Sequence, residues 1–240
     1  MTGSGGSMAV AAATLRVAEL FGPTFQGEGA SVGQRAFFIR LSGCNLDCGW
    51  CDTPYTWDWS RFDRAAESRV MAPSDVLGWV LGQRPQLVVV TGGEPLLQQR
   101  ALLPVLEGLH RAGVPVEIET NATMLPDPAV VAAVTRFNVS PKLTGSGVAS
   151  QRRLKPEVLQ ALQDTGKTCF KFVIAGEDDV DEVAALQAAL GLAPVWVMPE
   201  GTTPEAVLAG LRALAEPALV HGWNLTPRLH VLLWGDERGR

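Results

Sequence analysis

Three cysteines stand within eight residues, at Cys44, Cys48 and Cys51, in a chain that has only one other cysteine. Three thiolates in a C-x3-C-x2-C loop can ligate one [4Fe-4S] cluster and leave one iron open for an exogenous ligand. Zinc is the alternative, and because structural zinc usually takes four ligands, the fourth would come from Cys169, His110, His221 or His230. The spacing therefore predicts a metal centre whose content is a cluster or a zinc ion.

Polar or glycine-rich clusters also end the other apolar segments of the chain. They fall at residues 42–51, 91–94, 117–121 and 138–142, and at Glu177 and Glu200. In parallel α/β folds the active site collects at the carboxyl ends of the strands. We therefore expect these clusters to meet in one pocket together with the cysteine loop.

The elements that would position these clusters follow a regular rhythm. Strand-like runs rich in Val, Ile and Phe begin near residues 36, 87, 115, 136, 169 and 194, and helix-like segments begin near residues 73, 96, 127, 155, 178 and 203. Pro204 after Thr203 is typical of a helix start, and Gly113, Gly166 and Gly191 of helix ends. The pattern predicts an α/β fold of six βα units with strands apolar on both faces, either an open sheet or a partial barrel, preceded by a strand near residues 15–21.

Composition excludes several classes of protein. The chain has 240 residues, is 47% hydrophobic and 19% charged, and carries a net charge of −5. It lacks the basic surface that would attract a nucleic-acid backbone, and it lacks an apolar run long enough to span a membrane. We therefore expect a cytoplasmic protein that binds neither nucleic acid nor a membrane. Residues 1–8 are Gly/Ser-rich and predict a flexible leader or cloning remnant; residues 9–240 predict a single domain.

The cysteine spacing, Trp50 before the last cysteine and "TGGEP" at residues 91–95 together resemble the radical S-adenosylmethionine (SAM) superfamily. The resemblance implies a partial (β/α)6 barrel over roughly residues 36–200, with N-terminal and C-terminal strand extensions. It also implies a [4Fe-4S] cluster on Cys44, Cys48 and Cys51, and a reductive cleavage of SAM that releases a 5′-deoxyadenosyl radical. Implied SAM contacts are Gly49, Trp50, Gly92, Gly93, Glu94, Glu119, Asn121, Ser140, Pro141, Lys142 and Met198.

With "FQGEG" at residues 25–29, "RLSGC" at 40–44 and "CDT" at 51–53, the chain further resembles the 7-carboxy-7-deazaguanine synthase (QueE-type) family. This resemblance implies a lyase of queuosine-type 7-deazapurine biosynthesis that converts 6-carboxy-5,6,7,8-tetrahydropterin into 7-carboxy-7-deazaguanine and ammonia. It implies substrate contacts from Phe25, Gln26, Gly27, Glu28, Arg40 and Thr91, and a Mg²⁺ ion at Thr53. Without the family resemblance, Asp52 and Thr53 would be interpreted as a turn or cap.

Two other functions compete with this interpretation. A radical SAM activase acting on a glycine of a partner protein also uses C-x3-C-x2-C but would not need "FQGEG" or Thr53, and a noncatalytic zinc module would need only the thiols. The family resemblance implies an electron donor such as flavodoxin or ferredoxin, and a homodimer. We expect residues 221–240 to form an apolar strand with a polar tail over the pocket, near His230 or Asp236.

Overall fold

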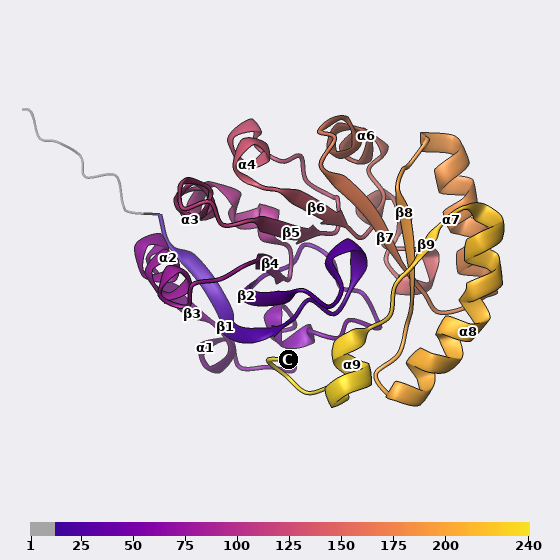
Figure 1. The fold of residues 1–240 in the computed structure, drawn as a ribbon, viewed down its shortest axis with the longest axis horizontal. Helices are drawn as coiled ribbons and strands as arrows, with labels where there is room; N and C mark the ends of the chain where they lie inside the picture. Colours follow the sequence, from indigo (N-terminus) through magenta and orange to yellow (C-terminus); the bar gives the residue numbers. More distant parts are fainter. Residues whose placement is uncertain (1–12) are drawn as a thin grey trace, which may run out of the picture.

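The computed structural model describes residues 13–240, so the expected leader at residues 1–8 lies outside the described residues. Within that range, six parallel strands form the centre of a curved sheet (Figure 1). In spatial order they are β2 (Arg35–Leu41), β4 (Val88–Gly92), β5 (Val116–Thr120), β6 (Arg136–Val139), β7 (Thr168–Ile174) and β8 (Val195–Pro199). The six predicted βα units are confirmed, and the arrangement is a partial barrel.

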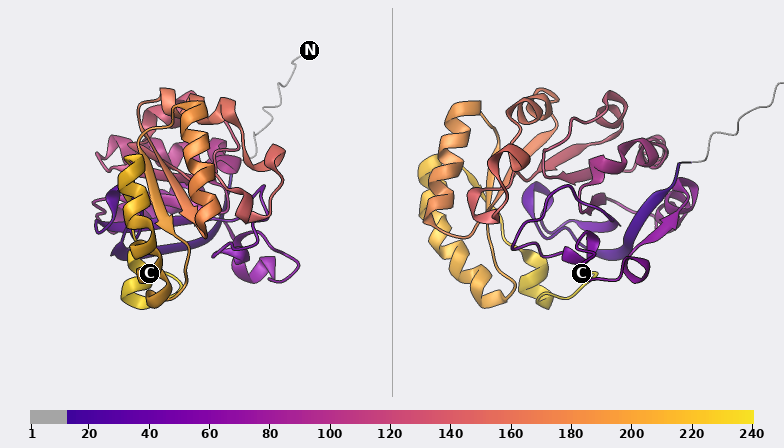
Figure 2. Two further views of the ribbon diagram at one scale, coloured as in Figure 1. Left: turned by 90° about the vertical axis from the view of Figure 1, so that its right-hand side faces the viewer. Right: turned by 180° about the vertical axis from the view of Figure 1, so that it is seen from behind.

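Helices cover the outer face of this sheet (Figures 1 and 2). They are α2 (Pro73–Gly82), α3 (Gln99–Arg111), α4 (Pro128–Ala133), α6 (Pro156–Asp164), α7 (Glu177–Leu190) and α8 (Pro204–His221). Thr203 caps α8 by accepting a hydrogen bond from the backbone N–H of Ala206. Gly113, Gly166 and Gly191 adopt positive φ where they follow helices, which confirms the predicted ends.

The two faces of the strands differ in chemistry, which corrects the prediction that both are apolar. Side chains alternate along a strand, so Ile118 and Phe172 pack in the core against the helices. Glu117, Glu119 and Lys171 occupy the alternate positions of β5 and β7, and all three take part in polar contacts with the segment at residues 26–31 or with strand β4. The inner face of the barrel is therefore polar, and it provides most of the site described below.

An N-terminal extension closes one edge of the sheet, as predicted. Strand β1 (Leu15–Phe25) pairs antiparallel with β2 on one side and with the short β3 (Arg69–Met71), which follows the four-residue helix α1 (Arg64–Glu67), on the other. The connection from β1 to β2 contains the 3-10 turn η1 (Gly29–Ser31). Ser31 donates a hydrogen bond to Glu117, so this connection enters the polar interior of the barrel.

The C-terminal segment corrects another prediction. A strand is present, but it is the two-residue β9 (Asn224–Leu225), parallel to β8. The apolar run that we expected to be a strand is the helix α9 (Leu229–Trp234), and its Leu229 N–H is hydrogen-bonded to the Gly27 carbonyl. A short apolar run does not distinguish helix from strand by periodicity. After α9 the tail returns toward β1 and α1, where the C-terminus lies (Figures 1 and 2).

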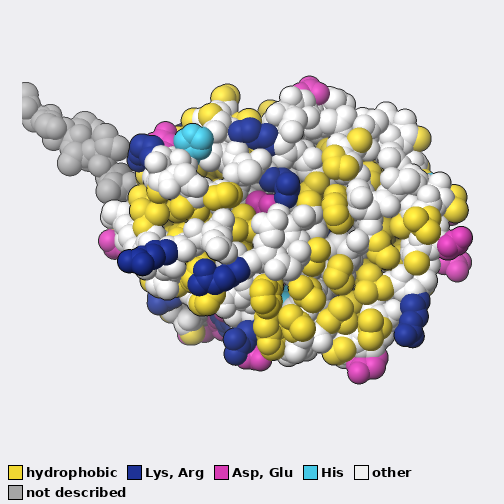
Figure 3. Space-filling view, in the orientation of Figure 1, with side chains coloured by type: hydrophobic (Ala, Val, Ile, Leu, Met, Phe, Trp, Pro, Cys, Tyr) yellow, Lys and Arg dark blue, Asp and Glu magenta, His cyan; other side chains and the backbone are white. Residues whose placement is uncertain are grey.

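On the face drawn in Figure 3, hydrophobic side chains are spread over the part that α8 and α9 occupy in Figure 1. Exposed large apolar residues of these two helices are Leu208, Leu219, Val220 and Leu233. Among residues 13–240, none of the helices combines the length and apolar character needed to cross a bilayer.

Candidate active site

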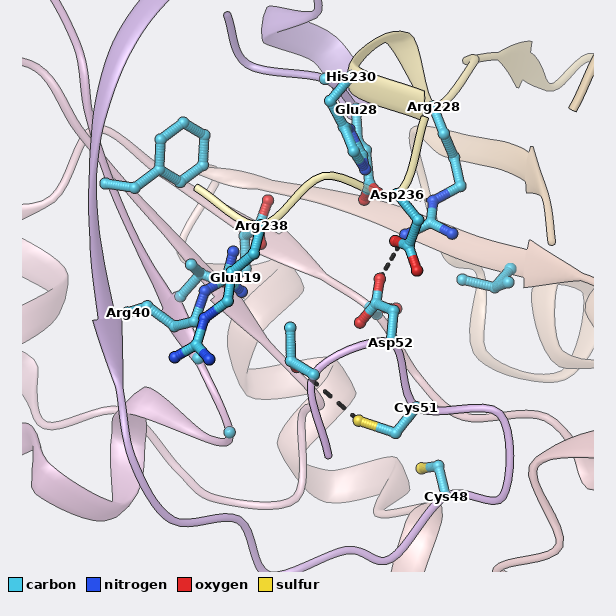
Figure 4. Close-up of a pocket in the computed structure, with 18 of the residues that line it drawn as sticks. Glu28, Arg40, Cys48, Cys51, Asp52, Glu119, Arg228, His230, Asp236 and Arg238 are labelled. Atoms are coloured by element: carbon cyan, nitrogen blue, oxygen red, sulfur yellow. Dashed lines mark hydrogen bonds and ion pairs between the residues drawn. The ribbon is translucent and has the colours of Figure 1, made fainter. Parts of the chain in front are cut away.

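A cavity of roughly 390 Å³ lies at the carboxyl ends of the parallel strands. It is lined by residues from β1, β2, β4, β5 and β7, from the cysteine loop, and from the C-terminal tail. Figure 4 shows Cys48 and Cys51 at one end, Arg40 and Glu119 on one side, and Glu28, Arg228 and His230 on the other. The strand-end clusters therefore meet in one pocket, as predicted, with one exception: Glu177 begins helix α7 and does not line the cavity.

Most of the predicted site residues line this cavity. They are Phe25, Gln26, Gly27, Glu28, Arg40, Cys44, Cys48, Trp50, Cys51, Thr53, Thr91, Gly92, Gly93, Glu119, Asn121, Ser140, Lys142 and Met198. Three do not: Gly49, Glu94 and Pro141 are absent from the lining. His230 and Asp236, which we expected near the pocket, also line it.

The cysteine loop is fixed by two backbone hydrogen bonds, one directly before Cys44 and one between Cys48 and Cys51. Gly43 N donates to the Thr56 carbonyl at 2.6 Å, and Gly49 N donates to the Ser146 carbonyl at 3.0 Å. Burial raises the pKa of the Cys44 thiol to about 11 and also raises that of Cys48, so both are protonated in the metal-free protein at neutral pH. Metal ligation would therefore displace protons from this loop.

The donor set of the loop fits an iron–sulfur cluster. Thiolates are the usual protein ligands of such clusters, and N–H groups point at two of the sulfurs: the Leu46 backbone at Cys44 Sγ (3.4 Å) and the Trp57 indole at Cys51 Sγ (3.3 Å). Cys169 is buried elsewhere and donates to Asn138 Oδ1. Within residues 13–240, no three His, Cys, Asp or Glu side chains are placed to hold a single metal ion.

Glycines 92 and 93 have a structural role that the sequence does not reveal. A Cβ at Gly92 would lie 2.0 Å from the Leu41 carbonyl oxygen, and one at Gly93 would lie 2.0 Å from the Gly43 carbonyl oxygen. The close approach that these glycines permit is to strand β2 and the start of the cysteine loop. Glu94 is fully buried and accepts hydrogen bonds from Leu96 N, Thr120 Oγ1 and Asn121 N, so its carboxylate joins the ends of β4 and β5.

Glu119 connects two of the predicted substrate residues on the inner face. It accepts a hydrogen bond of 2.6 Å from Thr91 Oγ1 and one of 3.2 Å from Gln26 Nε2. Together these groups present an amide, a hydroxyl and a carboxylate to the cavity. Such a set can pair with the donors and acceptors on the edge of a polar heterocycle.

A buried charge cluster that the sequence did not predict occupies the opposite wall (Figure 4). Lys171 Nζ contacts Glu28, and Arg228 reaches three segments: Glu28 at 3.3 Å, the Gly201 carbonyl at 2.7 Å, and Asp52. Burial raises the pKa of Glu28, but the charges of Lys171 and Arg228 outweigh it and hold that pKa well below its usual value. Glu28 is therefore ionised, and Asp52 is an ion-pair partner instead of a simple turn residue.

A second unpredicted group surrounds Glu19 on strand β1. Its carboxylate accepts hydrogen bonds from Arg40 Nε (2.8 Å), from Tyr55 Oη (3.0 Å) and from Arg238 of the C-terminal tail. The Arg40 guanidinium thus has one edge fixed by Glu19 while the residue lines the cavity. For the first of these two groups the sequence offered a signal of buried charge pairing, because Lys171 is a charged residue inside the apolar strand "CFKFVI". It offered no such signal at Glu19 or Arg238.

Polar groups from β5, β6 and the following loops line the wall next to the cysteines. Lys142 Nζ donates to Ser140 Oγ at 3.0 Å and lies 5.5 Å from the centre of the Trp50 ring. Asn121 Nδ2 lies 3.8 Å from Cys44 Sγ. A cation, a hydroxyl and an amide beside the thiols can bind a ligand that carries both a carboxylate and an amino group.

Comparison with known proteins agrees with this geometry. The model of the Radical SAM superfamily matches residues 38–143. A 7-carboxy-7-deazaguanine synthase of Pyrobaculum aerophilum is 38% identical over 94% of this chain and 97% of its own length. The chain belongs to the 7-carboxy-7-deazaguanine synthase family. A Bacillus subtilis member is 28% identical over 93% of this chain and 97% of its own length. The crystal structure of QueE from Escherichia coli superposes with a TM-score of 0.67 at 26% identity, and the match covers 89% of this chain and 93% of that chain.

Membership of the 7-carboxy-7-deazaguanine synthase family makes the protein a radical SAM enzyme of deazapurine biosynthesis. Its cofactors are a [4Fe-4S] cluster and SAM, which agrees with the thiols and with the polar wall beside them. The synthase interpretation is thereby favoured over the activase and the zinc module.

Proposed function

We propose that the protein converts 6-carboxy-5,6,7,8-tetrahydropterin into 7-carboxy-7-deazaguanine with release of ammonia, as a single domain formed by residues 9–240. One observation carries the proposal: the cysteine loop and the polar residues of the inner barrel face line the same cavity. When bound, the cluster and SAM supply one-electron chemistry that yields a 5′-deoxyadenosyl radical. The chain's own residues bind and orient the pterin and exclude water.

The polar side chains divide into two sets by the ligand they suit. Gln26, Thr91 and Glu119 offer complementary donors and acceptors for the heterocycle, and Arg40 offers a planar guanidinium for its carboxylate. Phe25, Gly27 and Glu28 also line the cavity, Glu28 from the opposite wall (Figure 4). The contacts proposed for SAM are Trp50, Gly92, Gly93, Asn121, Ser140, Lys142 and Met198, with Glu94 and Gly49 supporting the backbone around them and Pro141 standing between Ser140 and Lys142 in the chain.

Thr53 is the proposed protein ligand of a Mg²⁺ ion. Its hydroxyl lines the cavity 3.8 Å from Cys51 Sγ, whereas the neighbouring Asp52 carboxylate is engaged by Arg228. Mg²⁺ takes oxygen ligands and keeps several waters, so one hydroxyl and the substrate carboxylate can serve. We further propose a flavodoxin or ferredoxin as electron donor, a homodimer, and a cytoplasmic location.

The test is an anaerobic turnover assay. The reconstituted, reduced protein is incubated with SAM, Mg²⁺ and the carboxytetrahydropterin, and the products are analysed by mass spectrometry. We expect a deazaguanine carboxylic acid and one equivalent of ammonia, and no product from Cys48→Ala, which cannot hold the cluster. A cluster-loaded protein that cleaves SAM but leaves the pterin unchanged would reject the substrate assignment.

The magnesium site has its own test. Thr53→Ala removes the hydroxyl and leaves the thiols, so we expect normal iron and sulfide content but a higher Mg²⁺ concentration for half-maximal turnover. Thr53→Ser, which keeps the hydroxyl, should respond to Mg²⁺ as the wild type does. An unchanged Mg²⁺ response in Thr53→Ala would remove this residue from the metal site.

A further inference from the structure

The indole N–H of Trp57 lies 3.3 Å from Cys51 Sγ. Trp57 also lines the cavity, beside the thiols of the cysteine loop. Indole nitrogen is a donor only, so this contact directs an N–H dipole at the sulfur. We infer that Trp57 is a positioning residue for the cluster. Its hydrogen bond to the Cys51 ligand raises the reduction potential of the cluster.

The chain folds so that this donor is held in place. After Cys51, the 3-10 turn η2 (Pro54–Thr56) reverses the backbone, and Trp57 N donates to the Pro54 carbonyl at 3.1 Å. Thr56 is fully buried; its hydroxyl donates to the Thr53 carbonyl at 2.8 Å and its carbonyl accepts from Gly43 N at 2.6 Å. The turn is therefore fastened to the residue that precedes Cys44, and the indole is positioned by both ends of the cysteine loop.

The three sulfurs differ in the donors that they receive. Cys44 Sγ accepts from the Leu46 backbone at 3.4 Å and has the Asn121 amide at 3.8 Å. Cys51 Sγ has the Thr53 hydroxyl at 3.8 Å in addition to the closer Trp57 indole (Figure 4 labels Cys51). Among the described side chains, Trp57 thus makes the shortest side-chain hydrogen bond to any of the three thiols.

The effect on potential has a definite sign. Reduction adds one negative charge to the cluster and its thiolates, and an N–H directed at a ligand sulfur stabilises that charge more in the reduced than in the oxidised state. Removing the donor therefore makes reduction harder. The inference rests on the cysteine loop holding the cluster of the proposed function, but it concerns the cluster's potential and does not depend on which substrate is used.

Trp57→Phe is the direct test, since it keeps a six-membered aromatic ring and removes the N–H donor together with the pyrrole part of the indole. We expect wild-type iron and sulfide content, and an EPR-monitored redox titration of the holoenzyme should give a midpoint potential more negative than that of wild type. Trp59→Phe is the matched control, because the centre of the Trp59 ring lies 5.6 Å from the Arg64 guanidinium carbon. The midpoint potential of the cluster in this variant should match that of wild type. A Trp57→Phe potential equal to that of wild type overturns the inference.

A second measurement decides the question if Trp57→Phe fails to take up its cluster. In holoenzyme with ¹⁵N-indole-labelled tryptophan, pulsed EPR of the reduced cluster should show a ¹⁵N coupling that persists in Trp50→Phe, since Trp50 is the other tryptophan that lines the cavity. Absence of that coupling rejects the hydrogen bond. Because both measurements report on the cluster alone, a wrong substrate assignment would leave them unaffected.

Discussion

At the scale of single residues, the site is organised by buried charges that neutralise one another. Glu28 lies between Lys171 and Arg228, and the side chains of these three residues are at most 14% exposed. The two cations keep the pKa of Glu28 low in spite of burial, and the carboxylate in turn raises the pKa of Lys171 against the effect of burial. A charge in such a place is tolerated only with its partner.

Glu28→Gln should therefore destabilise the fold by about 3–5 kcal/mol, because Lys171 would remain buried without its partner. Urea unfolding of the metal-free protein measures this change, and Glu28→Gln/Lys171→Met should recover part of it. Glu107→Gln is the control: its pair with Arg111 is 3.7 Å long and exposed, so we expect a change below about 1 kcal/mol. Equal effects of the two single substitutions would contradict this account.

At the scale of elements, strand β4 must approach strand β2 and the cysteine loop more closely than a side chain allows. Gly92 has a φ of +130°, and the space that its Cβ would take holds the backbone of Leu41. The glycines of "TGGEP" thus join the second parallel strand to the start of the cysteine loop. The spacing between the thiols and the inner face depends on that contact.

Gly92→Ala should lower the free energy of unfolding by about 2–4 kcal/mol, from the strained φ and the displaced strand. It should also reduce the iron bound on reconstitution, since Gly43 and Cys44 follow the displaced Leu41. Gly78→Ala provides the comparison: its Cβ meets nothing within 4 Å in helix α2, and it should stabilise by about 0.5–1 kcal/mol. Normal stability and iron content in Gly92→Ala would show that β4 can shift freely.

The sequence predicted the elements well wherever a signal was local. Apolar runs, capping residues and glycines predicted the six βα units, and the spacing of Cys44, Cys48 and Cys51 predicted a metal centre whose thiols line the cavity. The helix α9 was missed because six residues are too few to show a period. The clustered cations were missed for another reason: Arg228 meets Glu28 across 200 residues of sequence, and only the folded chain brings them together.

At the scale of the whole molecule, the open side of the partial barrel is crossed by the C-terminal tail. Residues 236–240 all line the cavity, together with residues 26–28 from the opposite end of the chain. Arg238 fastens this tail: it contacts Glu19 on β1 and Glu67 on α1, and lies 3.9 Å from the centre of the Tyr55 ring. The tail therefore joins the last element to the first beside the cavity.

Arg238→Gln should release the tail without unfolding the protein. Its side chain is 45% exposed, so we expect a stability loss below about 1 kcal/mol, whereas backbone amides of residues 236–240 should exchange hydrogen faster. Because these residues line the cavity, KM for the pterin should rise several-fold while the cluster content and SAM cleavage without substrate stay normal. Arg111→Gln changes an exposed arginine that does not line the cavity, and it should alter none of these quantities. A wild-type KM in a variant whose tail exchanges freely would show that the tail lies beside the substrate without holding it.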